Sequence, residues 1–284
     1  MFPLHAKMRR LICRTLFLIF GVGPFPRLGV TGSAVGTTIG RGIGVLFQLW
    51  ILTSARTRLV VGARQLRLDV AVMLKLVRLS LTAMFQYMIQ MASWIGVVRI
   101  MASFGSAAVA ANTLAIRVIV FAILPSWGMS NAAATLVGQN LGAGKPERAE
   151  KAVWRTGFYN ALFLGGIGLV FIAFAEKIIA LFTNDPAVAP LAVSGLRILS
   201  YGYISYAYGM VVTAAFNGAG DTSTPTLLNL FCFWVCQIPA AWLLSFHTSL
   251  GARGVFVAVI IGDTLLAISS ILLFRRGKWK KTVI

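Results

Sequence analysis

Long apolar runs, separated by short polar or basic connections, make up most of this 284-residue chain. Most runs exceed the roughly 20 residues that a membrane-spanning helix needs. Backbone groups in hydrocarbon must be paired internally, so these runs are expected to be helices, and the alternating pattern of barrel strands is not seen. The chain is therefore predicted to be an all-α multispan membrane protein. Its eight predicted spans are 11–25, 30–53, 79–102, 107–137, 155–183, 187–217, 225–247 and 253–275.

The charged residues lie mainly in the connections between the runs. Lys and Arg number 26 against seven acids, which gives a net charge of +19. Basic connections at 54–78, 138–155 and the C-terminal tail alternate with poor ones, and the positive-inside rule places the basic ones in the cytoplasm. This predicts a multi-pass protein of the inner (cytoplasmic) membrane with a cytoplasmic C-terminus. The lipid bilayer is then a partner, and nucleic acid is not, because no basic module with interleaved aromatics is present.

One sequence pattern occurs twice. "LGVTGSAVGTTIGR" (28–41) and "LGARGVFVAVIIGD" (250–263) share six of fourteen positions, and each enters a helix from a connection poor in basic residues. Their common orientation indicates a parallel repeat. The second copy closes a predicted six-helix unit, while the first has only one span before it, so about four helices of a matching unit are expected to be missing. A chance match between two glycine-rich helices is the alternative.

Several longer motifs resemble the multidrug and toxic compound extrusion (MATE) family. They are "LVGQNLGAGKPERAEKA" (136–152), "FNGAGDTSTPT" (216–226) and "FRRGKWK" (274–280), together with both repeat copies. The resemblance implies two six-helix lobes around a cavity, of which this chain holds the C-terminal lobe and the last two helices of the N-terminal lobe. The implied parts are an uncertain start (1–10), the two N-lobe helices (11–53), a basic cytoplasmic linker (54–78), the C-terminal lobe (79–275) and a basic tail (276–284).

The same resemblance implies a function. Family members export organic cations or amphipathic drugs in exchange for Na⁺ or H⁺ by alternating access, so the expected partner is a small organic substrate and the coupling ion is Na⁺ or H⁺. No cofactor is implied. The missing N-terminal lobe would be supplied in cis or in trans. Two alternatives stay open, namely an inactive transporter fragment and a lipid-linked sugar flippase of related architecture.

Asp263 is the only acid placed well inside a predicted span, and a buried carboxyl can bind a cation and a proton alternately. In the repeat alignment Arg41 stands opposite Asp263, so the two charges are predicted either to pair at the lobe interface or each to find a local partner. Some family members carry cation-binding acids near the positions of Gln90 and Tyr206, which are not acidic here.

No paired-carboxylate, Ser/His/Asp or Cys/His arrangement and no metal-ligand spacing appears, so neither an enzyme nor a metal site is expected.

Uncharged polar residues in the spans complete the candidate substrate and ion pathway, and in lipid they are expected to point inward. The alternative role for them is hydrogen bonding between helices. They are Gln86, Gln90, Asn112, Tyr203 and Tyr206. Pro125 and Gly128 are predicted to interrupt the fourth span, either as a static kink or as a hinge.

Overall fold

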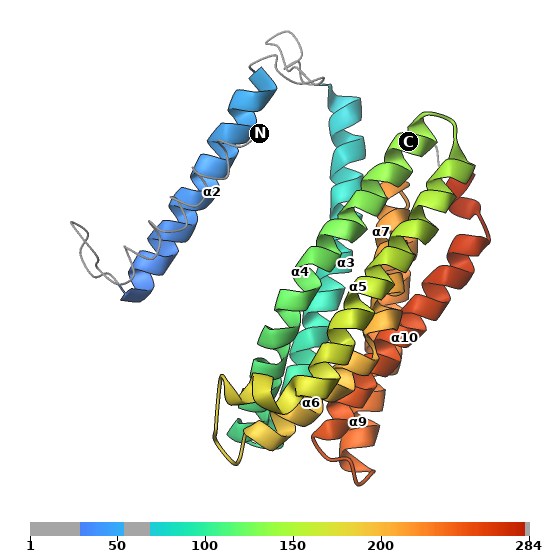
Figure 1. The fold of residues 1–284 in the computed structure, drawn as a ribbon. Helices are drawn as coiled ribbons and strands as arrows, with labels where there is room; N and C mark the ends of the chain where they lie inside the picture. The colour runs from blue at the N-terminus through green and yellow to red at the C-terminus, as the bar shows by residue number, and fades with distance from the viewer. Residues whose placement is uncertain (1–28, 54–68, 282–284) are drawn as a thin grey trace. The chain divides into compact units, whose positions relative to one another are not determined.

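The computed structural model describes residues 29–53 and 69–281, and every regular element in these ranges is a helix (Figure 1). The all-α prediction is confirmed. The chain divides near residue 73 into two compact units, and each is described on its own. In chain order the elements are α2 (Gly29–Thr53), α3 (Val70–Ala102), α4 (Ser106–Gly142), α5 (Pro146–Ala180), α6 (Ala189–Tyr201), α7 (Tyr203–Gly218), α8 (Ser223–Asn229), the π-helix η2 (Leu230–Gln237), α9 (Ile238–Phe246), α10 (Arg253–Arg275) and the 3₁₀-helix η3 (Lys278–Lys281).

Five stretches of helix are long and apolar enough to cross a membrane. They are Ser80–Ala102, Ser106–Gly142, Pro146–Ala180, Ser223–Phe246 and Arg253–Arg275, and they match five of the predicted spans. The predicted span 187–217 is instead two shorter helices, α6 and α7, which meet at Gly202. The predicted span 30–53 is helical as α2, although it is not among the five, and 11–25 lies outside the described residues.

α4 continues for 37 residues through Pro125 without a break, and the predicted kink or hinge at Pro125 and Gly128 stays a prediction. Pro125 and Gly128 are both exposed, and nothing lies within 4 Å of a Cβ added at Gly128. An exposed proline removes one hydrogen bond but forces no neighbouring helix to move. The irregular positions lie elsewhere, at Phe174 in α5, where the backbone is non-helical (φ −111°, ψ 15°), and in the π-helix η2.

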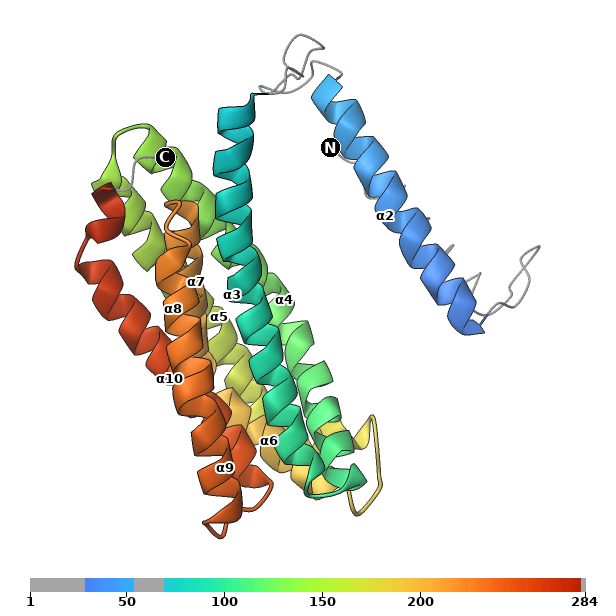
Figure 2. The same ribbon diagram turned by 180° about the vertical axis from the view of Figure 1, so that it is seen from behind.

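The two motifs "GQNLGAGK" and "FNGAGD" meet in space where α4 crosses α7 (Figures 1 and 2). A Cβ added at Gly218 would collide with the carbonyl oxygen of Ala134, and one added at Gly138 would lie 3.1 Å from the Gly218 carbonyl oxygen. Small residues therefore bring the two helix backbones into direct contact. Such packing is the main source of helix association in lipid, because no hydrophobic force drives apolar helix surfaces together there.

The tail after α10 folds back onto the same end of the bundle. A left-handed Gly277 (φ 71°) turns the chain, and the ring of Trp279 stacks on Phe274 at 4.5 Å between centroids. The Trp279 indole N–H donates to the Phe274 carbonyl oxygen at 2.9 Å, and Lys280 pairs with Glu150 at the start of α5. The motif "FRRGKWK" thus anchors the end of α10 to α5.

We predict that Gly218→Ala will destabilise the protein by about 1–3 kcal/mol, because its new methyl group must push two backbones apart. Thermal unfolding of the full chain in detergent measures the effect. Gly166→Ala is the matched control, since Gly166 lies within α5 and an added Cβ there meets open space. Equal melting temperatures for the two variants would contradict the close-contact explanation.

Candidate functional site

Asp263 is a partly buried carboxyl in the interior of the membrane-spanning helix α10. Among the described residues, no Lys, Arg or His lies within salt-bridge distance of it, and none of them forms a hydrogen bond with it. A lone carboxylate is costly in a medium without water, so such groups in membrane proteins usually mark a pathway for ions or substrates. Asp263 is therefore the centre of the candidate site.

Two side chains from other elements lie close enough to Asp263 to interact with its charge. They are Tyr206 of α7 and Cys232 of η2. The amide of Gln237, at the end of η2, packs against Gly262, where an added Cβ would lie 2.6 Å from its Oε1. Three helical elements thus bring a carboxyl, a phenol, a thiol and an amide to one region of the bundle interior.

The π-helix η2 forms one side of this region, and the sequence explains its position. Pro239 lies in the first turn of α9 and has no N–H, so the carbonyl four residues earlier, that of Val235, loses its α-helical partner. The eight residues of η2 adopt the wider i→i+5 pattern immediately before this point. Short π-segments frequently occur at functional sites because they re-aim the side chains that they carry. Here these side chains include Cys232 and Gln237.

The two glutamines of α3 lie in different surroundings although they are one turn apart. Gln86 is half-buried and Gln90 is exposed. The α8–η2 segment contacts α3 on both sides of Gln86 along the chain. The Thr226 hydroxyl donates to the Thr82 carbonyl oxygen at 3.4 Å, and the Trp234 indole N–H donates to the Ile89 carbonyl oxygen at 3.0 Å. Gln86 therefore lies on the packed side of α3, and Gln90 on its edge.

Asn112 and Tyr203 are core residues. Asn112 is buried within α4. Tyr203 is 3% exposed, its ring lies 6.2 Å from that of Phe171, and its hydroxyl has no hydrogen-bond partner among the described residues. The structure brings Tyr206 to Asp263 but places Tyr203 among the apolar side chains shared by α4, α5, α6 and α7. Arg41 is exposed on α2, in the other unit, and its pairing with Asp263 stays a prediction.

Sequence reasoning missed three buried amides. Gln237 is described above, while Asn160 of α5 donates to the Ala207 carbonyl oxygen at 3.2 Å and leaves its own oxygen without a partner. Asn229, the last residue of α8, is 3% exposed and its side-chain oxygen is likewise without a partner among the described residues. Their position inside apolar runs was the available signal. No group of three His, Cys, Asp or Glu able to hold a metal occurs in the described parts of the chain.

The MatE family profile matches residues 79–243, more than half of the chain. This chain belongs to the MatE family. It is 31% identical over 257 residues to the multidrug resistance protein NorM of Burkholderia vietnamiensis, covering 88% of this chain and 55% of that protein. It is 23% identical to a probable multidrug resistance protein NorM of Thermotoga maritima, with 94% and 57% covered. The chain thus spans somewhat more than half the length of these relatives.

Solved structures show the same fold. One, titled as an outward-facing conformation of a multidrug resistance MATE family transporter, superimposes with a TM-score of 0.86 at 24% identity and covers 96% of this chain and 61% of that one. A transporter of the MOP superfamily from Pyrococcus furiosus gives the same TM-score and identity. The helical arrangement described above is therefore that of a MatE protein.

We predict that Asp263→Asn will leave the protein as stable as the wild type or stabilise it by about 1–3 kcal/mol at mildly alkaline pH, because it removes a charge that no described Lys, Arg or His neutralises. Asp221→Asn is the matched control. The Asp221 carboxylate accepts hydrogen bonds from the Thr224 N–H at 3.1 Å and the Thr224 hydroxyl at 2.6 Å, so its loss should cost about 0.5–1.5 kcal/mol. Thermal unfolding in detergent compares them, and a lower melting temperature for Asp263→Asn would show that this carboxyl is a structural group.

Proposed function

We propose that this chain is part of a membrane efflux transporter that exports organic cations or amphipathic compounds in exchange for Na⁺ or H⁺. Membership of the MatE family and similarity to multidrug resistance proteins support the export of drugs. The observation that carries the proposal is Asp263, a carboxyl inside an apolar helix that has no cationic partner among the described residues. A cation, whether substrate, Na⁺ or H⁺, is the ligand that such a group lacks.

In the proposed mechanism Asp263 binds substrate and coupling ion alternately. Tyr206 offers an aromatic face and a hydroxyl to a flat cationic substrate beside the carboxyl. Gln237 and Cys232 add polar, uncharged groups from η2. The break at Gly202 and the π-helix provide positions where backbone hydrogen bonding is already irregular, so helix segments can shift there during alternating access at a lower cost than in a regular helix.

The proposed transporter needs an N-terminal lobe, in cis or in trans. We assign residues 11–53, which include α2, to that lobe, residues 54–78 to the cytoplasmic linker and residues 79–275 to the C-terminal lobe. The flank of α3 supports this assignment, because large apolar side chains are left open on it. Met84, Phe85, Tyr87 and Met88 are each 58–62% exposed. Lipid or a second lobe can cover such a surface, and in a two-lobe transporter the side of α3 beside Gln90 lines the shared cavity.

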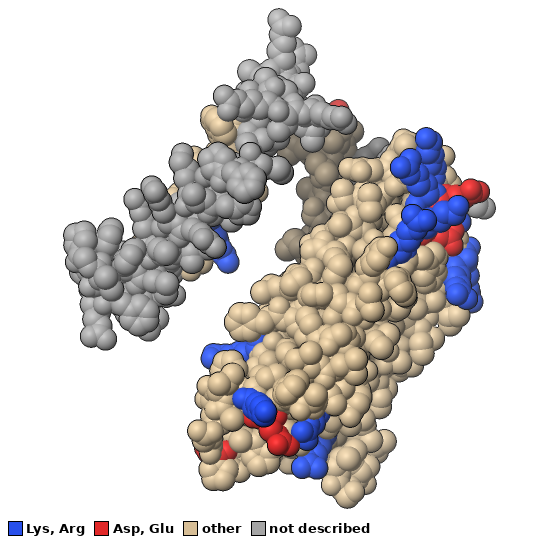
Figure 3. Space-filling view, viewed as in Figure 1, with Lys and Arg blue, Asp and Glu red and all other residues tan. Residues whose placement is uncertain are grey.

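The distribution of charge supports an inner-membrane location with the C-terminus in the cytoplasm. In the unit formed by residues 74–284, the α4–α5 connection and the end of α10 place a concentration of Lys and Arg at one end of the bundle (Figure 3). The opposite end carries fewer cations, and its Arg197 is paired with Glu176 at 3.0 Å. By the positive-inside rule the basic end faces the cytoplasm.

Efflux in a pump-deficient bacterial host tests the proposal. This chain alone, with membrane insertion verified, is predicted not to lower the accumulation of a cationic dye. A fusion of residues 54–284 to the preceding half of the Burkholderia vietnamiensis relative is predicted to lower it, and Asp263→Asn in that fusion should reduce the initial efflux rate at least about tenfold, the cost of about 1.4 kcal/mol in cation binding. Asp221→Asn should leave the rate nearly unchanged. Full efflux by the Asp263→Asn fusion would remove Asp263 from the mechanism.

A further inference from the structure

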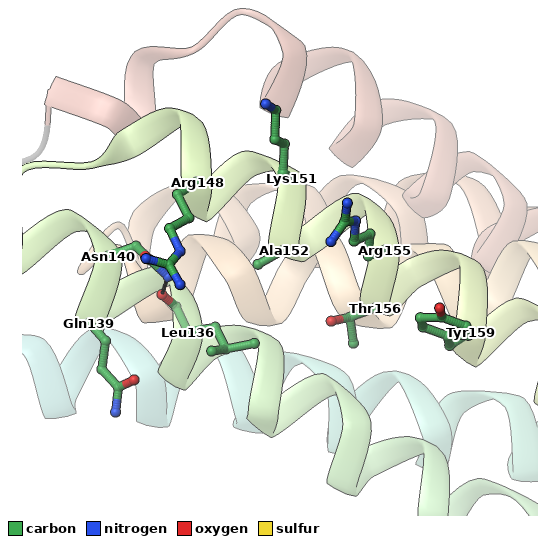
Figure 4. Close-up of a pocket in the computed structure, with 9 residues that line it drawn as sticks. All are labelled: Leu136, Gln139, Asn140, Arg148, Lys151, Ala152, Arg155, Thr156 and Tyr159. Atoms are coloured by element: carbon green, nitrogen blue, oxygen red, sulfur yellow. Dashed lines mark hydrogen bonds between the residues drawn. The ribbon is translucent and has the colours of Figure 1, made fainter.

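A basic hollow of about 500 Å³ lies between the end of α4 and the start of α5 (Figure 4). Arg148 and Arg155 line its α5 side, and Leu136 and Asn140 line its α4 side. Arg148 extends toward Asn140 of α4, while Lys151 and Arg155 project from α5 on the side away from α4 in this view (Figure 4). The hollow therefore joins two guanidinium groups to neutral hydrogen-bonding side chains.

The cations of this hollow are not neutralised by the described part of the protein. Neither Arg148, Lys151 nor Arg155 forms an ion pair with any described carboxylate. Two acids lie near the start of α5. Glu150 is bound to Lys280 and accepts from the Trp154 indole on the side that faces the tail, and Glu147 forms no ion pair with a described cation. An anion from outside the protein is the partner that this arrangement lacks, and guanidinium groups are well matched to phosphate oxygens.

The position of the hollow along α5 matches the depth of a lipid phosphate. Arg155 and Lys177 are 22 residues apart on α5, which corresponds to at most about 33 Å because the helix is kinked at Phe174 between them. This separation is close to the ~30 Å thickness of the hydrocarbon core. When Lys177 is at one interface, Arg155 is therefore at headgroup level in the opposite leaflet, and Arg148 lies farther out, toward water.

Along α5, from Arg155 toward the middle of the helix, the exposed side chains change from charged to aromatic to aliphatic. Polarity falls in the same order from the headgroup of a phospholipid to its acyl chains. Tyr159, one turn deeper than Arg155, lines the hollow and is 62% exposed, and the next turn presents Leu162, which is 65% exposed. A tyrosine at this level is typical of the membrane interface, and leucine of the acyl region. A soluble anion would use the guanidinium groups but would gain nothing from this apolar continuation.

We propose that the hollow between α4 and α5 binds the phosphate of an anionic phospholipid, with its acyl chains lying along Tyr159 and Leu162. Arg148 and Arg155 hold the phosphate oxygens, and Asn140 and Thr156 offer neutral hydrogen-bonding groups to the glycerol or headgroup hydroxyls. Basic pockets between helices at the cytoplasmic side are suited to such headgroups. A lipid bound there would anchor the α4–α5 end of the bundle in its leaflet, and this anchoring would not depend on substrate transport.

Native mass spectrometry of the full chain in detergent tests this binding, because it weighs the bound molecule directly. The wild type is titrated with phosphatidylglycerol and, separately, with phosphatidylcholine. The Arg148→Gln/Arg155→Gln variant should lose affinity for phosphatidylglycerol at least about tenfold, since each interfacial cation contributes roughly a factor of five. The Arg276→Gln/Lys278→Gln control removes the same charge from the same end of the bundle but not from the hollow, and it should bind like the wild type.

Two outcomes would overturn the proposal. An equal loss in the control variant would show attraction by net charge alone, and displacement of phosphatidylglycerol by an equal concentration of inorganic phosphate would identify a soluble anion as the ligand. Arg148→Lys/Arg155→Lys keeps both charges but loses the planar guanidinium groups, so it should bind phosphatidylglycerol more weakly than the wild type and more tightly than the glutamine variant. Thermal unfolding in phosphatidylcholine shows that each variant is folded, so a loss of binding by a misfolded protein is recognised as such.

Discussion

Hydrocarbon offers no hydrogen bonds to a peptide backbone, and this constraint governs the whole architecture. Every span must close its own N–H and C=O groups, which is why the described chain contains helices and no strands. The same constraint limits where irregular backbone can occur. One side of η2 packs against α10, and at the break a Cβ added at Gly202 would lie 3.1 Å from the side chain of Ile260 of α10. Irregularity inside a membrane is tolerated where protein surrounds it, and such positions are also available to function.

Association of the helices depends on close packing. Lipid tails are themselves apolar, so moving apolar side chains from lipid into a helix interface gains little free energy. At the crossing of α4 and α7, glycine allows the two backbones to touch. At the same end of the bundle, the aromatic stack of Phe274 and Trp279 and the Lys280–Glu150 pair hold the tail against α5. This leaves the opposite side of α5, with Arg148 and Arg155, open to the surroundings. Packing on one face of the helix thus determines which cations stay unpaired on the other.

Polar groups in the bundle interior fall into two kinds. Asn160 and Tyr203 lie in well-packed surroundings between helices. Asn160 donates to the Ala207 carbonyl oxygen and the Tyr203 ring packs beside Phe171, while the Asn160 oxygen and the Tyr203 hydroxyl have no partner among the described residues. Asp263 differs because its neighbours Tyr206 and Cys232 bring no positive charge. A structural carboxyl in lipid would be expected to have a basic partner, so the lack of one in the described residues separates Asp263 from the other interior polar groups.

The sequence by itself determined the class of the protein, most of the spans and the special standing of Asp263, because length, apolarity and loop charge act locally and can be read along the chain. It did not determine that the span 187–217 divides at Gly202 or that a π-helix precedes Pro239. A proline's effect depends on which neighbour can replace the lost hydrogen bond, and that neighbour is known only after the helices pack. The grouping of Asp263 with Tyr206, Cys232 and Gln237 was likewise decided by the tertiary structure, since these residues come from three elements whose contacts no local pattern encodes.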